Sequence, residues 1–224
     1  MGLKSCLRDL EAFVFALLPS STRTTWQAYK SRRKMNRQYG RRPDPFNYGA
    51  HSYERARFDA AEAALGERRW RKVLEAGCGE GYFTERLARH CDDVAAVDIS
   101  AVALARARER VPAARYIEAD LMTWRPPQDE RYDLIVLADV LTYLDRPVVE
   151  AEFAALFERV VSWLAEGGRL LMVDGFANDQ DFSRRRSYRE RFVKAGLTAT
   201  SDFVLPGAAR NQTRCLLSVL DKPA

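Results

Sequence analysis

The sequence predicts a doubly wound α/β fold, in which helices cover both faces of a mostly parallel sheet. From Arg71 onward, short apolar runs alternate with segments of helical periodicity, as in parallel sheets joined by crossover helices. Residues 134–137 are apolar throughout, which is typical of a strand buried on both faces. A strand at 72–76 leads into a glycine-rich turn and a helix, the arrangement that forms ligand crevices in such sheets.

The chain divides into a helical N-terminal extension or lid over residues 1–70 and a main domain over 71–224. Helical spacing of apolar residues in the extension predicts three helices, over about 3–18, 24–38 and 52–65. The sequence Pro-Ser-Ser at 19–21 ends the first, and the glycine- and proline-containing segment 40–45 ends the second.

The main domain is expected to contain seven strands. We place them at 72–76, 93–97, 114–119, 133–138, 168–173, about 199–205 and about 213–219. The helices between them are expected at 81–90, 101–110, 147–165 and 183–195. The long helix expected at 147–165 has one apolar face, formed by Val149, Phe153, Leu156, Phe157, Val160 and Leu164.

Composition limits the class of protein. The chain has 224 residues, a net charge of +5 and a pI near 9.1, which is too weakly basic to indicate nucleic-acid binding by itself. Its four cysteines show no metal-binding spacing with the two histidines, so we expect free thiols and no metal. No apolar run reaches the roughly 18 residues of a membrane span, and no signal peptide is recognisable. We therefore expect a cytoplasmic protein.

The glycine-rich turn contains Gly77, Gly79 and Gly81, which let a ligand approach the backbone closely. Such a strand–turn–helix usually holds a nucleotide or a nucleoside. The pattern is shorter than the Gly-x-Gly-x-x-Gly of dinucleotide sites, and Glu75 would repel a pyrophosphate but attract a cation. A ligand with a ribose, an adenine and a positive charge fits better than a dinucleotide, and S-adenosylmethionine has all three.

Three further acidic residues follow predicted strands, where an open sheet forms its crevice. Asp98 ends the second strand, and its carboxylate can accept hydrogen bonds from both ribose hydroxyls. Asp120 follows the third strand and can accept a hydrogen bond from an adenine amino group, or alternatively cap the next segment. Asp139 follows the fourth strand.

These segments resemble the motifs of the class I S-adenosylmethionine-dependent methyltransferases. Residues 75–81, Glu-Ala-Gly-Cys-Gly-Glu-Gly, match the E/D-x-G-x-G-x-G motif, and residues 97–100, 119–121 and 132–141 are similar to the ribose, adenine and fourth-strand motifs. The resemblance covers 71–175 closely and 176–224 loosely. It implies a seven-stranded sheet whose last strand is antiparallel. The runs 53–58 and 69–72 are most similar to the nodulation-type N-methyltransferases.

These motifs predict that the cofactor is contacted by Glu75, Gly77, Gly79, Gly81, Asp98, Ile99, Asp120, Leu121 and Ala138. Tyr48 is a further expected contact, because the segment 48–53 before the third helix could close over the cofactor as a lid. We expect Glu75 near the methionine ammonium, with a hydrogen bond inside the turn as the alternative. Ala138 is expected to contribute only its backbone, as the resemblance implies.

Three residues are candidates for catalysis. Asp139 can hold or deprotonate an acceptor amine, or alternatively cap the following helix. Tyr143 is expected at the substrate, with packing as the alternative. His51 is a candidate base for an oxygen nucleophile, with an exposed helix-cap position as the alternative.

The sequence therefore predicts methyl transfer from S-adenosylmethionine to a nitrogen or oxygen of a small molecule. Either the basic run at 30–42 or the arginines at 184–186 would attract an anionic acceptor or an acidic carrier protein. One alternative is an RNA or protein methyltransferase that docks through the basic run, although no RNA-binding module is recognisable. Another is a non-catalytic cofactor-binding protein.

Overall fold

The computed structural model describes residues 18–146, 149–207 and 213–224, and these form one seven-stranded sheet flanked by helices. The strand order is β3-β2-β1-β4-β5-β7-β6, with β7 antiparallel to both of its neighbours. The strands are β1 (Trp70–Ala76), β2 (Cys91–Asp98), β3 (Arg115–Glu118), β4 (Tyr132–Ala138), β5 (Leu164–Phe176), β6 (Thr198–Leu205) and β7 (Arg214–Asp221). The predicted doubly wound sheet with an antiparallel last strand is thus confirmed.

Seven helices are described in these ranges. They are α2 (Ser20–Arg41), α3 (Ser52–Ala63), α4 (Tyr82–His90), α5 (Ala101–Arg110), α6 (Leu141–Leu144), α7 (Glu150–Trp163) and α8 (Asp179–Lys194). The helix expected over 3–18 lies outside the described residues, apart from Leu18. None of the helices in the described ranges has the length and hydropathy that a membrane crossing requires.

Two predicted boundaries differ from the structure for identifiable reasons. Helix α8 begins four residues earlier than expected because the Asn178 side chain caps it by accepting a hydrogen bond from Asp181 N at 2.8 Å. Helix α2 continues to Arg41, three residues past the expected end. Its last turn is held by Arg106, which donates from Nη1 to the carbonyl of Tyr39 at 3.0 Å.

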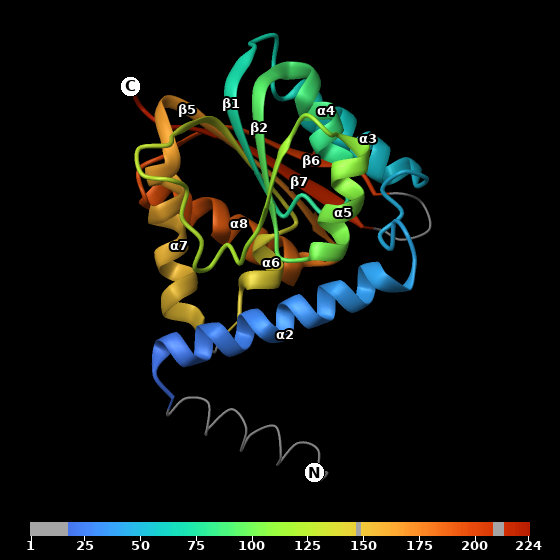
Figure 1. The fold of residues 1–224 in the computed structure, drawn as a ribbon. Coiled ribbons are helices and arrows are strands. Elements are labelled where there is room, and N and C mark those ends of the chain that lie inside the picture. The colour runs from blue at the N-terminus through green and yellow to red at the C-terminus, as the bar shows by residue number, and fades with distance from the viewer. Residues whose placement is uncertain (1–17, 147–148, 208–212) are drawn as a thin grey trace.

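The helices form a layer on each face of the sheet (Figure 1). Side chains of α3 and α4, including Phe58 and Phe83, pack with Val73 and Val136 on one face, and α5 covers the same face through Leu104. On the other face, α7 and α8 bury a set of aromatic and aliphatic side chains against β1, β4 and β5. Strands covered on both faces need continuous apolar sequences, as β4 has over residues 134–138.

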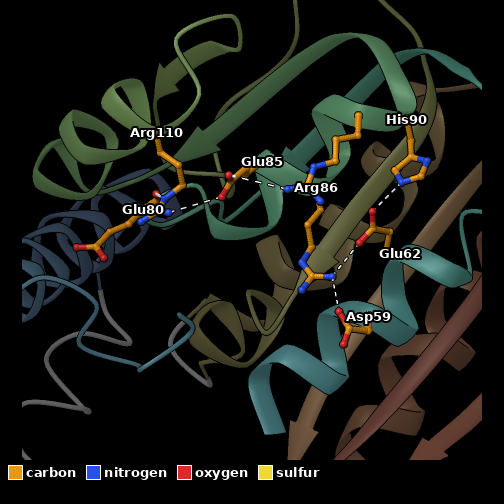
Figure 2. A network of polar contacts seen from close by, with 8 residues as sticks. Asp59, Glu62, Glu80, Glu85, Arg86, His90 and Arg110 are labelled. Carbon is orange, nitrogen blue, oxygen red and sulfur yellow. Dashed lines mark hydrogen bonds and ion pairs between the residues drawn. The ribbon is translucent and has the colours of Figure 1, made fainter. Parts of the chain in front are cut away.

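A polar network joins the three helices of the first face (Figure 2). Arg86 of α4 donates hydrogen bonds from Nη1 to Asp59 at 2.6 Å and Glu62 at 2.8 Å, both on α3. Arg110 of α5 forms an ion pair with Glu85 of α4, and its Nη1 lies 3.6 Å from Oε2 of Glu85. Ion pairs of this kind are individually weak, at about 0.2–1 kcal/mol when exposed. The contacts of Arg86 connect α3 to α4, and the contact of Arg110 connects α5 to α4.

Helix α2 crosses the edge of the sheet near α6 and α5 (Figure 1). It is attached to α5 because Arg106 binds its last turn and the Ser100 hydroxyl donates to Asn36 Oδ1 at 2.7 Å. Helix α3, by contrast, packs on one face of the sheet, where Phe58 and Ala61 are buried in the hydrophobic core together with Leu65, which follows the helix. The N-terminal segment thus contributes one helix to the core and one across the sheet edge. A domain boundary near residue 70 stays a prediction.

Candidate functional site

A cavity of about 720 Å³, here called the main cavity, lies between α2 and the carboxyl ends of the strands. Open α/β sheets bind ligands at this edge, where the strand order reverses between β1 and β4. Nine of the residues singled out from the sequence line the main cavity. They are Tyr48, Gly77, Asp98, Ile99, Asp120, Leu121, Ala138, Asp139 and Tyr143.

The glycine-rich turn is built so that its backbone forms part of the wall. Gly77 N and Cys78 N both donate to the carbonyl of Val97, at 2.7 and 3.1 Å, which ties the turn to the end of β2. Gly77 has a φ of +82°, and a Cβ placed on it would lie 2.9 Å from Val140. Only glycine fits this backbone without a shift.

The other two glycines of the turn pack against protein and do not line the main cavity. A Cβ on Gly79 would lie 2.8 Å from the Tyr39 hydroxyl, and one on Gly81 would lie 3.2 Å from Ala107 of α5. Their small size lets α2 and α5 approach the turn. Direct contact of Gly79 or Gly81 with a cofactor stays a prediction.

Asp98 is a buried carboxylate at the end of β2, and it lines the main cavity. Its Oδ2 accepts a hydrogen bond from Gly79 N at 2.9 Å, and its Oδ1 accepts one from Ser100 N at 2.8 Å. Burial raises the pKa of Asp98, while these backbone hydrogen bonds oppose the rise. The backbone of Ile99 is a third hydrogen-bond partner. The orientation of the carboxylate is therefore fixed, and because its two oxygens have about four acceptor sites, it can still accept from a ligand.

The next part of the wall combines apolar surface with a second carboxylate. Ile99 and Leu121 line the main cavity beside Asp120, whose Oδ1 accepts from Met122 N at 3.0 Å. Burial raises the pKa of Asp120, and this backbone hydrogen bond opposes the shift. Such a wall suits a flat aromatic ring with a hydrogen-bond donor at its edge.

Glu75 lies beneath the turn and not on the wall of the main cavity. Its side chain is 2% exposed and accepts a hydrogen bond from the Thr84 hydroxyl of α4. Burial raises the pKa of Glu75 to about 8, although the hydrogen bond from Thr84 opposes the shift. Glu75 thus has a structural hydrogen bond, as the alternative role expected, but its partner lies in α4 and not inside the turn. Contact with an ammonium group stays a prediction.

Asp139 is held by two protein groups at the end of β4. Its Oδ1 accepts from Gly175 N at 2.7 Å, and its Oδ2 pairs with Arg57, a 3% exposed residue of α3. Nε of Arg57 also lies 3.1 Å from Oε2 of Glu54. Asp139 has a φ of +54°, which is uncommon for a residue other than glycine. Its side chain does not cap α6, so the capping alternative is wrong.

Tyr143 and Tyr48 line the main cavity, whereas His51 lies outside it. Burial raises the pKa of both tyrosines, so both are neutral hydrogen-bonding groups at neutral pH. His51 is the N-cap of α3 and accepts a hydrogen bond from Tyr53 N at 3.3 Å. That position favours the helix-cap alternative for His51, and a catalytic role for it stays a prediction.

A smaller cavity of about 310 Å³, here called the second cavity, adjoins the main one. The two share four lining residues, which are Phe46, Tyr48, Asp139 and Tyr143. Beyond this shared wall, the second cavity is lined by Arg57, Glu54 and Gly175, and by Asp181 and Arg185 of α8. Asp139 therefore lies at the wall shared by the two cavities, where a molecule bound in the main cavity would meet one bound in the second cavity.

Sequence reasoning expected an N-terminal lid and a role for the basic run at 30–42, but it did not include the individual residues of α2 among the site residues. Trp26, Lys30, Arg33 and Arg37 line the main cavity, and they recur at the spacing of one helical face. The signal was therefore present in the sequence as a periodic arrangement of basic and aromatic residues. The basic run at 30–42 faces the cavity with several of its charges. The described residues contain no group of His, Cys, Asp and Glu side chains that could hold a metal ion.

Comparisons with known proteins agree with this geometry. A family model described as Nodulation protein S (NodS) matches residues 30–184. Nodulation protein S of Sinorhizobium fredii is 33% identical over 145 residues, covering 63% of this chain and 64% of that protein. A trans-aconitate 2-methyltransferase of Rhizobium etli is 34% identical over 102 residues, covering 45% of this chain and 37% of that protein. The match thus spans less than two thirds of the length of these relatives.

A solved structure is similar over most of the chain. It is the N-methyltransferase NodS from Bradyrhizobium japonicum in complex with S-adenosyl-L-homocysteine. The TM-score is 0.75 and the sequence identity 25%, and the match covers 87% of this chain and 99% of that one.

Proposed function

The chain belongs to the Nodulation protein S family of class I S-adenosylmethionine-dependent methyltransferases, and from this we propose that it methylates a nitrogen or oxygen of a small molecule. The observation that carries the proposal is the main cavity, which brings Asp98, Asp120 and Asp139 to one wall at the carboxyl ends of the strands. The RNA or protein methyltransferase alternative is not favoured by the relatives, which are NodS proteins and trans-aconitate methyltransferases.

The residues present fit S-adenosylmethionine. Asp98 offers a carboxylate of fixed orientation to a ribose diol, because its two oxygens have about four acceptor sites and its backbone partners do not fill them all. The side chains of Ile99 and Leu121 offer apolar contact to an adenine ring, and Asp120 can accept from its amino group. These three features lie side by side on one wall, as the parts of a nucleoside require.

The reaction needs alignment more than acid–base chemistry from the protein. When bound, S-adenosylmethionine supplies a methyl group on a positively charged sulfur. In the proposal, Asp139 accepts a hydrogen bond from the acceptor N–H and directs the nitrogen lone pair toward the main cavity. Arg57 and Gly175 N fix that carboxylate. A nitrogen acceptor is favoured because His51, the candidate base for an oxygen, lines neither cavity.

We further propose that the acceptor is anionic. The face of α2 that lines the main cavity carries Lys30, Arg33, Lys34 and Arg37, which would attract a negatively charged molecule toward the opening. One group of relatives is named for a carboxylic acid, trans-aconitate. An acceptor presented by an acidic carrier protein would be attracted in the same way, so free and carrier-bound acceptors should be compared directly.

The test is enzymatic production of S-adenosylhomocysteine. The protein should be incubated with S-adenosylmethionine and a library of amines and alcohols, and the product measured by mass spectrometry. We expect conversion with at least one amine, and a loss of rate in Asp139→Asn without loss of cofactor binding. Binding of cofactor without conversion for any acceptor would instead support the non-catalytic alternative.

A further inference from the structure

The second cavity contains an arginine whose charge is not neutralised by the described residues. Arg185 of α8 is 8% exposed and lines this cavity. Its Nε donates to the carbonyl of Gly175 at 3.1 Å, but its Nη1 is buried without a hydrogen-bond partner. A buried charged donor left unpaired is costly, so such groups usually have a ligand, a water or an ion as partner.

The neighbouring acidic groups do not satisfy this arginine. Asp139 and Glu54 pair with Arg57 instead. Asp174 of β5 is buried, with an Oδ1 that also has no partner in the described residues. Burial raises the pKa of Asp174 to about 8, and Asp139 adds to the rise. The charge of Arg185 opposes this rise, but among the described residues no hydrogen bond joins Asp174 Oδ1 to Arg185 Nη1.

We propose that the second cavity binds an oxyanion of the methyl acceptor, a carboxylate or a comparable group, against Nη1 of Arg185. This inference rests on the proposed methyl transfer and specifies its substrate as a small molecule that carries both an amine and an oxyanion. The oxyanion would lie in the second cavity, while the amine meets Asp139 at the wall shared with the main cavity. A guanidinium matches a carboxylate in both charge and geometry.

The acidic residues of the second cavity agree with a ligand of both charges. Glu54 and Asp181 line it together with Asp139, and a simple anion would be repelled by them. An ammonium on the same molecule offsets that repulsion and pairs with the acidic side of the cavity. It releases one proton to solvent before the nitrogen lone pair can accept the methyl group. The cationic face of α2 has a different role, because its exposed side chains attract an anion without fixing its position.

The experiment uses amino acids of increasing length as probes, from glycine to 6-aminohexanoate, each with its carboxamide as the uncharged control. Binding to the full chain saturated with S-adenosylhomocysteine is measured by calorimetry. We expect at least one amino acid to bind about tenfold or more tightly than its amide, the scale of a charge-assisted hydrogen bond. Arg185→Gln should abolish this preference.

Arg184→Gln is the matched control, since Arg184 is half-exposed and its Nε lies 3.8 Å from Asp145. It should keep the preference. If Arg184→Gln loses as much of the preference for the amino acid over its amide as Arg185→Gln does, surface charge explains the preference and the inference is wrong. If S-adenosylhomocysteine binds but no amino acid is preferred over its amide, the inference fails while the proposed function stands. Failure of S-adenosylhomocysteine to bind would overturn both.

A second measurement covers the case in which Arg185→Gln does not fold. Nitrogen-15 spectra of the arginine side chains, assigned with Arg185→Lys, report on Arg185 in the unmodified protein. We expect its side-chain signal to shift on addition of the preferred amino acid and not on addition of the amide. An unchanged signal under saturating amino acid would contradict the proposal.

Discussion

Replacing Arg57 with glutamine tests the buried ion pair that holds Asp139. Arg57 is almost fully buried between Asp139 and Glu54, so the substitution leaves two carboxylates without their cation. Breaking a buried ion pair typically costs about 3–5 kcal/mol. Because both carboxylates keep some exposure, at 22% and 16% of the side chain, we expect the lower end, about 3 kcal/mol.

The assay is urea unfolding of the wild-type protein and of Arg57→Gln at pH 7. In a chain of this size each kcal/mol moves the melting temperature by about 2–4 °C, so a parallel thermal scan should show a decrease of roughly 6–12 °C. Arg55→Gln on the same helix is the control, because Arg55 is exposed and bonds only to backbone carbonyls. It should stay within about 0.5 kcal/mol of wild type.

Adding Asp139→Asn to Arg57→Gln distinguishes the stability lost with the ion pair from the stability lost through packing of the Arg57 side chain. The double variant should lose less stability than the sum of the two single variants, by about 1 kcal/mol or more, because the second change removes an unpaired charge. A stability for Arg57→Gln within about 1 kcal/mol of wild type would refute the reasoning, as would strict additivity of the two changes.

Three other substitutions test separate parts of the site. Asp98→Ala should weaken S-adenosylhomocysteine binding by about 1–3 kcal/mol in calorimetry, and unchanged affinity would refute the ribose role. Gly77→Ala places a Cβ 2.9 Å from Val140 at a positive φ. The free energy of unfolding should therefore decrease by about 1–2 kcal/mol or more. An unchanged urea midpoint would contradict the close packing of this turn against Val140. Burial raises the pKa of Glu75 to about 8. Because the unfolded state gives up this proton near pH 4.5, wild-type stability should fall as pH rises between these values. Glu75→Gln can keep the contact with Thr84 and should flatten that part of the stability profile; an unchanged slope would show that the residue does not titrate in this way.

The sheet and the wall facing the nucleoside could be predicted from sequence because their determinants are local. Residues 134–138 of β4 are all apolar, and Gly77 has a positive φ that residues other than glycine rarely adopt. Acidic residues that directly follow strands, such as Asp98 and Asp120, then reach the same edge because parallel strands end together. The residues that line this wall follow from their position in the chain alone.

The rest of the site depends on contacts between distant segments, which no local pattern reveals. Arg57 meets Asp139 across 82 positions of the chain, and nothing in its own helix distinguishes it from Arg55. Arg185 is one of three consecutive arginines, and only the packing of α8 on β5 buries it while Arg184 stays half-exposed. The position of α2 over the main cavity likewise depends on Arg106 of α5, which donates to the carbonyl of Tyr39 in α2 and also pairs with Glu80 of the glycine-rich turn.

The main cavity is expected to bind a nucleoside bearing a cationic sulfur. This can be measured by calorimetric titration of the folded protein with S-adenosylmethionine, S-adenosylhomocysteine and, as the rival ligand, a nicotinamide dinucleotide. We predict binding of the first two, and none of the dinucleotide, because the wall offers carboxylates where a pyrophosphate would need donors. Tight binding of the dinucleotide, or no binding of either sulfur compound at millimolar concentration, would contradict the account.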